Sequence, residues 1–185
     1  MPVITEDALT FDFPVDWQAE KFDAWSFYKN QFSRCGEACT SCSKCDHKNA
    51  SGVKAIDILA IDTNSRCWCI EIKDYRQWQR TKPSDLADEV ALKVRDSLAT
   101  LVAARVNANV ANEQSMANAA LRCSRLRVVL HLEQPAKPSK LFPQGINPTN
   151  VQQRLKQLIK AIDPHPLVID MKRMTQMNSV AWSVS

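Results

Sequence analysis

Hydrophobic and polar positions first show a helical spacing near the start of the chain. Four aromatic residues recur three or four positions apart: Phe22, Trp25, Tyr28 and Phe32. This spacing predicts a helix that begins at Trp17, is capped by Asp16, and ends near Arg34. An aromatic stripe on one helix face usually packs into a core.

Two strand-like stretches follow. In residues 53–62, apolar side chains alternate between two faces, and residues 67–75 place Trp68, Ile70 and Ile72 on one face. The intervening residues 63–66 (TNSR) have the composition of a tight turn. The pattern therefore predicts an antiparallel hairpin.

The rest of the chain alternates helical and strand-like patterns. A helix is expected from Asp85 to Val106, because Ser84 and Asp85 follow Pro83 and acidic residues fill the first turn. Further expected elements are a helix over 112–121, a strand over 126–132, a proline-rich loop over 134–148, a helix capped by Thr149 or Asn150 and ended by Pro164, and strands over 167–171 and 180–184. This order predicts an α/β domain with a mixed sheet.

Length and composition narrow the class of protein. The 185 residues, 45% of them hydrophobic, favour one folded domain over residues 1–185. Only three glycines are present, and no glycine-rich nucleotide-binding motif occurs. No apolar run approaches the roughly 20 residues of a membrane span. The acidic N-terminus does not resemble a signal peptide, so a cytoplasmic protein is expected.

Charge is unevenly distributed along the chain. Residues 1–33 contain two lysines and six acidic residues, a net charge of −4, while the whole chain has +4, so the other residues carry +8. A basic body is compatible with a polyanionic partner, and an ordinary solvated surface explains it equally well.

Charged residues interrupt the two predicted strands. Asp57 lies in the first strand, and Glu71 and Lys73 share one face of the second. In a hairpin, Asp57 can project beside them. Two converging carboxylates suit Mg²⁺ or Mn²⁺, and a neighbouring lysine can act on a water or a phosphate. The alternative is an ordinary Glu–Lys pair on a solvated strand.

These residues resemble the PD-(D/E)xK nuclease superfamily, through Asp57 in KAIDILAID and Glu71-x-Lys73 in CIEIKDYR. The sequence departs from the motif at Ile56, where the family pattern has proline. The resemblance implies a restriction-endonuclease-like core, a mixed β-sheet flanked by helices. It also implies a Mg²⁺-dependent endo- or exonuclease that hydrolyses DNA phosphodiester bonds in repair, restriction or defence. Asp57 and Glu71 would bind the metal, and Lys73 would position the attacking water.

The same resemblance suggests further site residues. Many members add an acid from the first helix, for which Glu20 is the candidate and Asp23 the alternative. A basic residue near the phosphate would be Lys93, or else Arg95. Expected contacts to DNA phosphate are Arg76, Arg80 and Lys82, with Trp78 among them as a possible base-stacking residue. A solvated surface is the alternative role for each of these side chains.

A cysteine-rich loop over residues 35–47 is expected after the first helix. It contains Cys35, Cys39, Cys42 and Cys45, followed by His47. Seven cysteines, an odd number, favour metal ligation over a disulfide framework in a reducing compartment. Four thiolates suit a structural Zn²⁺. The compact spacing leaves a 4Fe–4S cluster as the alternative.

The sequence is therefore compatible with three functions. The first is a DNA nuclease that works as a homodimer or inside a larger repair or defence assembly. The second is a catalytically inactive, metal-stapled nucleic-acid- or protein-binding module of the same fold. The third is a small interaction protein that uses the cysteine loop for recognition. Divalent-metal binding at Asp57 and Glu71 would distinguish the first from the second.

Overall fold

The computed structural model describes residues 1–32, 53–78, 80–135, 145–176 and 180–185. Its strands are β1 (Val3–Glu6), β2 (Leu9–Asp12), β3 (Gln18–Lys21), β4 (Ile58–Ile61), β5 (Arg66–Asp74), β6 (Arg125–Glu133), β7 (Leu167–Ile169) and β8 (Ser183–Val184). Its α-helices are α1 (Leu86–Asn107), α2 (Ala111–Leu121), α3 (Pro148–Ile159) and α4 (Met171–Met174). A 3₁₀ turn, η1 (Phe22–Ala24), and a short π-helix, η2 (Tyr28–Phe32), follow β3. No helix of the described residues has the length and apolar character to cross a membrane.

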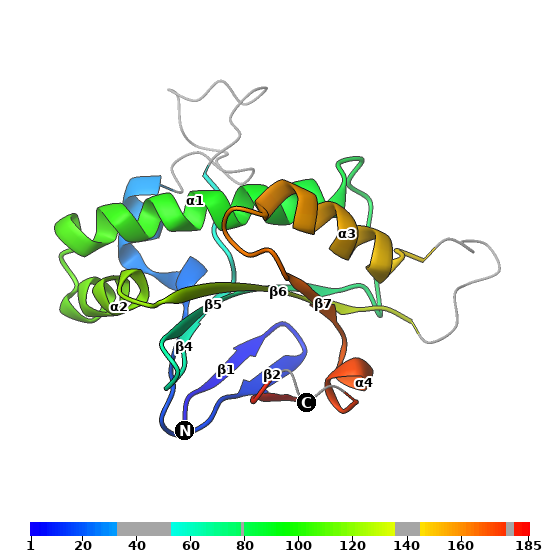
Figure 1. Cartoon of the computed structure of the whole chain (residues 1–185), viewed down its shortest axis with the longest axis horizontal. Helices are drawn as coiled ribbons and strands as arrows, with labels where there is room; N and C mark the ends of the chain where they lie inside the picture. Colours follow the sequence, from blue (N-terminus) through cyan, green and yellow to red (C-terminus); the bar gives the residue numbers. More distant parts are fainter. Residues whose placement is uncertain (33–52, 79, 136–144, 177–179) are drawn as a thin grey trace.

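Two sheets organise the fold. The larger sheet has the strand order β3-β4-β5-β6-β7, and the smaller sheet has the order β1-β2-β8. Strands β3, β4 and β5 pair antiparallel, whereas β5, β6 and β7 run parallel. Figure 1 shows α1 and α3 over one face of the larger sheet and the smaller sheet beneath the other. The middle of the larger sheet, formed by β4 and β5, is therefore buried on both faces, whereas β3 at its edge is partly exposed.

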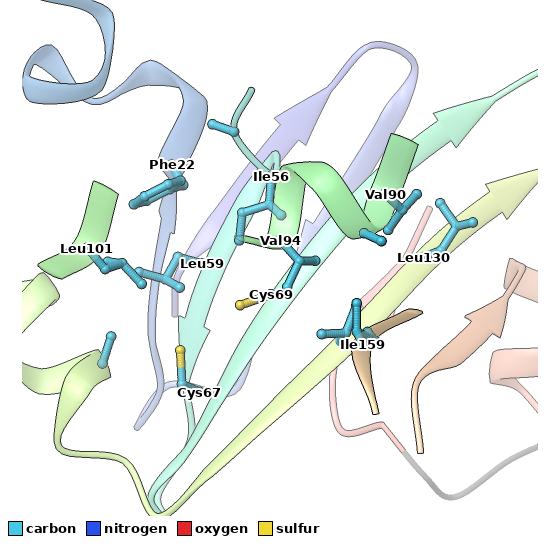
Figure 2. Close-up of a cluster of buried hydrophobic side chains, with 14 of the residues drawn as sticks. Phe22, Ile56, Leu59, Cys67, Cys69, Val90, Val94, Leu101, Leu130 and Ile159 are labelled. Carbon is cyan, nitrogen blue, oxygen red and sulfur yellow. The ribbon is translucent and has the colours of Figure 1, made fainter. Parts of the chain in front are cut away.

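The main core lies between the helices and the larger sheet. Side chains from α1, such as Val90 and Val94, meet Leu59 of β4 and Cys69 of β5 (Figure 2). Ile159 of α3 joins the same cluster. Each of these side chains is excluded from water. Burial of apolar surface stabilises the folded state by roughly 25 cal/mol per Å². This packing fixes α1 across the strands that carry the charged residues.

A second core joins the two sheets. Trp17, Trp68 and Trp182 pack against one another, with ring centroids 5.2–6.0 Å apart. Strand β5 therefore contributes to both cores, because its even-numbered residues face the smaller sheet and its odd-numbered residues face α1.

The predicted hairpin is confirmed. The predicted first helix is wrong for residues 18–21, which form a strand, whereas residues 28–32 in its later part are helical. Strands β4 and β5 pair antiparallel, with Ile58 opposite Ile70. The expected helix from Trp17 begins instead with β3, because residues 18–21 find hydrogen-bonding partners on β4. The aromatic residues then lie along the 3₁₀ turn η1 and the wider π-helix η2. Phe22 of η1 and Trp25, which follows it, still pack into the core. Tertiary pairing thus overrides the helical spacing.

Helix α1 begins where the sequence predicts, with Asp85 accepting hydrogen bonds from the backbone of Ala87 and Asp88. Helix α3 begins earlier than expected. Asn147 caps it through the backbone N–H groups of Thr149 and Asn150, and Pro148 takes the first helical position. A proline assigned to the preceding loop is therefore part of the helix.

The structure confirms a mixed α/β fold with helices packed on a sheet. The more specific expectation, a restriction-endonuclease-like core, is not confirmed. The predicted cysteine loop over 35–47 falls outside the described residues. The organisation of the chain as a single domain stays a prediction.

Candidate functional site

A cluster of four charged side chains lies between β4, β5 and α1. Asp57 immediately precedes β4, and its N–H donates to the carbonyl of Ile70 at 3.2 Å. Because Ile58 is opposite Ile70, Asp57 lies across from Glu71. Both side chains point to the face that α1 covers. The hairpin register therefore brings the two predicted carboxylates together.

Two lysines complete this group, which we call the charged cluster: Asp57, Glu71, Lys73 and Lys93. Lys93 Nζ lies 2.6 Å from Glu71 Oε1 and 3.3 Å from Asp57 Oδ1. Lys73 Nζ lies 2.5 Å from the same Glu71 oxygen. Asp57 Oδ2 accepts a hydrogen bond from the N–H of Ile72 at 2.6 Å. Two carboxylates and two ammonium groups thus pair inside the protein.

Burial changes the acidity of this cluster. The Glu71 side chain is 1% exposed, and its desolvation, together with the nearby Asp57 carboxylate, raises the pKa of Glu71 to about 7. Burial by itself would lower the pKa of Lys93, but the carboxylates of Glu71 and Asp57 raise it well above its usual range. Lys93 therefore remains charged, while Glu71 can gain a proton near neutral pH.

Helix α1 also binds the segment that leads into Asp57. Asp96 accepts a hydrogen bond from the N–H of Lys54 at 3.0 Å, and Ser97 accepts one from the N–H of Ile56 at 2.9 Å. Together with Lys93, these side chains form one face of α1. The helix therefore fixes the backbone on which Asp57 stands.

The described residues do not support the predicted Mg²⁺ site at Asp57 and Glu71. Lys93 Nζ contacts both carboxylates, and so takes the position that a bridging cation would need. Among the residues that the structure describes, no three His, Cys, Asp or Glu side chains come together as a metal-binding group. The buried oxygen Oε2 of Glu71 has no hydrogen-bond partner, but a single oxygen does not make a magnesium site.

The structure separates the two candidates for an additional acid. Glu20 is on β3 rather than on a helix, and it accepts hydrogen bonds from Trp25 Nε1, at 2.8 Å, and from the side-chain amide of Asn112. Burial raises the pKa of Glu20. Asp23 interacts electrostatically with the charged cluster. Burial, and then the Asp57 carboxylate, raise the pKa of Asp23 to about 6. Asp23, the alternative candidate, is thus the acid that interacts with Asp57.

The basic residues predicted to contact phosphate already have protein partners. Arg76 pairs with Asp74 at 2.6 Å, and Arg80 pairs with Glu89 at 3.0 Å. Lys82 lies 3.7 Å from Glu89 and is half-exposed, and Lys93 belongs to the charged cluster. Trp78 projects into solvent with 79% of its surface exposed. These side chains follow the cluster along the chain, but the three arginine and lysine residues of this loop are not free cations.

Comparison with known proteins gives a different functional direction. The whole chain aligns with a cysteine–tRNA ligase of Neisseria meningitidis at 34% identity. The chain spans about 30% of the length of that protein. No family model matches the chain, and no solved structure matches it.

This similarity corrects the function predicted from the short motif. Assignment to the PD-(D/E)xK superfamily is wrong, as are the prediction of a DNA nuclease and that of DNA as the partner, because the relative is a tRNA ligase. Asp57, Glu71 and Lys73 do come together as the motif requires, but with Lys93 they form an internal ion-pair network. A motif of three charged residues does not by itself distinguish a nuclease active site from an internal ion-pair network.

Sequence reasoning missed a second group of basic residues. The segment RCSRLR, residues 122–127, contains three arginines within six residues at the start of a strand. In the structure Arg122 and Arg125 are exposed. The density of arginine in this segment was the signal that could have revealed this exposed basic surface.

Proposed function

We propose that this chain is a tRNA-binding module that accompanies tRNA charging. The observation that carries this proposal is the 34% identity to a cysteine–tRNA ligase over the whole chain. Because the chain spans about 30% of that protein, we propose tRNA as the partner and do not extend the ligase reaction to this chain.

The charge of the chain supports a polyanionic partner. The residues after position 33 carry a net charge of +8. Neutralisation of RNA phosphates by lysine and arginine releases condensed counterions, and this release drives association. The acidic residues of the charged cluster oppose this attraction little, because each is paired with a lysine.

We assign the charged cluster a positioning role in this module. Lys93 joins α1 to Glu71 on β5 and to Asp57, the residue before β4, and Glu71 is fully buried. Burial of four charges is costly unless they pair with good geometry, and the pairing specifies one arrangement of helix and strands. The cluster would therefore fix the framework that presents basic surface residues to tRNA.

A direct binding experiment tests this function. At physiological ionic strength, we expect the protein to bind a cysteine-accepting tRNA transcript at least about tenfold more tightly than duplex DNA with the same number of phosphates. Fluorescence anisotropy with labelled nucleic acids measures both affinities. Equal affinities for tRNA and DNA, or no measurable binding of tRNA, would overturn the proposal.

We also propose that the cysteines of residues 35–47 bind zinc, an assignment compatible with the relationship to a cysteine–tRNA ligase. Protein purified without chelator should contain about one Zn²⁺ per chain by elemental analysis.

Replacement of Cys39 and Cys42 by serine should remove the zinc and lower the thermal unfolding temperature, because metal binding at such a site stabilises the folded state. Replacement of Cys123, which lies outside this segment, provides the control. Iron with sulfide in place of zinc would identify a cluster instead.

A further inference from the structure

Basic side chains gather around three hollows at the end of the larger sheet where β6 begins. The first hollow, about 600 Å³, lies between residues 123–127 and residues 162–165. The second, about 390 Å³, lies along α3 and shares Arg127 and His165 with the first. The third, about 470 Å³, lies between the end of α1 and α2. It includes Arg122, which directly precedes the residues of the first hollow.

The basic residues that line these hollows form one group, which we call the basic track: Arg105, Arg122, Arg125, Arg127, Lys156 and His165. Among the described residues, Asp163 is the one acidic side chain that lines any of the three hollows. The track therefore carries an excess of positive charge.

Arg127 is held in a fixed orientation at the junction of two hollows. Its guanidinium lies 5.5 Å from the ring centroid of Trp68, and it donates to the carbonyl of His165 at 3.1 Å. Asp163 lies 3.5 Å from Arg127, and its carboxylate also accepts hydrogen bonds from the N–H groups of Val128 and His165. A pre-oriented guanidinium loses less conformational entropy when it binds a phosphate.

The other cations of the track are available to a ligand. Arg105, Arg122, Arg125 and Lys156 are exposed, and in the part of the chain that the structure describes they form no ion pair. Neutral hydrogen-bonding side chains lie among them, including Ser115 and Asn118 in one hollow and Thr149 in another. Such a mixture of cations with hydroxyl and amide groups suits phosphate oxygens and ribose hydroxyls.

We propose that the basic track binds the phosphate backbone of tRNA. This inference rests on the proposed function and names the surface that performs it. The first two hollows share Arg127 and His165, and Arg122 of the third directly precedes the first along the chain. Successive phosphates can therefore be bound along this surface, with Arg127 as the fixed contact and the exposed arginines and Lys156 as adaptable ones. Phosphate contacts of this kind determine affinity and orientation without reading the base sequence.

Charge reversal at single positions tests the track. Arg125→Glu and Lys156→Glu each replace an exposed cation that has no ion-pair partner among the described residues, so the fold should persist. Lys172→Glu is the matched control, because Lys172 is exposed on α4, beyond β7 and so at the opposite end of the sheet. It makes the same change in net charge.

We expect each track variant to lose about tenfold in affinity for the tRNA transcript, and the salt dependence of binding to weaken by about one phosphate contact. The control should lose less than about threefold. If the wild-type protein binds tRNA and the track variants bind it equally well, tRNA does not bind at the basic track, while the proposed function stands. If Lys172→Glu loses as much affinity as the track variants, the net charge of the protein determines tRNA binding, and the proposal of a specific basic track is wrong. If the wild-type protein fails to bind tRNA, the proposed function is wrong.

Discussion

Replacement of Lys93 by methionine should lower the free energy of unfolding by about 3–5 kcal/mol at pH 8, the usual cost of removing one partner from a buried ion pair. Lys93 Nζ contacts both Asp57 and Glu71, whereas Lys73 contacts Glu71. Without Lys93, the two buried carboxylates would repel each other, and Asp57 would lose its cation. Urea unfolding followed by circular dichroism measures the change.

Two variants determine whether this loss comes from the carboxylate pair. Lys156→Met removes an exposed lysine from α3 and should change the free energy of unfolding by less than about 0.5 kcal/mol. Asp57→Asn combined with Lys93→Met should be less destabilised than the sum of the two single variants, because the amide removes the repulsion and can still accept the hydrogen bond from Ile72. A loss below about 1 kcal/mol in Lys93→Met, or strict additivity in the double variant, would contradict this account of the cluster.

The second large effect is an increase in stability between pH 8 and pH 5. The folded protein raises the pKa of Glu71 to about 7 from an ordinary value of 4.5, through burial and the Asp57 carboxylate. Between these pH values the folded state binds more protons than the unfolded state, so the free energy of unfolding falls as the pH rises. A shift of this size corresponds to a difference of about 2–3 kcal/mol between pH 5 and pH 8.

Urea unfolding at a series of pH values measures this dependence. Glu71→Gln should lose most of it, because the amide does not titrate. The smaller remainder should come from Asp23, whose pKa burial and the Asp57 carboxylate raise to about 6, and from Glu20, whose pKa burial also raises. Below about pH 3.8, the ordinary pKa of an aspartate, the trend should reverse as the pH falls toward the folded pKa of Asp74, since the hydrogen bond from Arg76 lowers the pKa of that carboxyl. A wild-type protein that is equally stable at pH 5 and pH 8 would show that Glu71 does not carry the raised pKa.

The similarity to a tRNA ligase changes the function assigned to the charged residues, but the structure still places those residues together. The residues that resemble a nuclease motif do converge, and the hairpin that brings them together is confirmed. Their chemistry depends on Lys93, which comes from a helix some 20 residues further along the chain. The spacing of a motif specifies which side chains share a face, but not which charge from another element fills the space between them.

The sequence by itself determined the local elements and their order. Helix α1 could be predicted from apolar spacing and the Asp85 cap, and the hairpin of β4 and β5 from alternation on either side of a turn. These features depend on residues close together in the chain, so their signals are local.

Tertiary structure decided the rest. Residues 18–21 form a strand because β4 offers hydrogen-bonding partners, although the aromatic residues that follow have helical spacing. Arg127 lies over Trp68 because β6 pairs with β5 in parallel, a contact between residues that are far apart in sequence. The charged cluster and the basic track both depend on such long-range pairings, which arise only when α1, α3 and the sheet bury a common core.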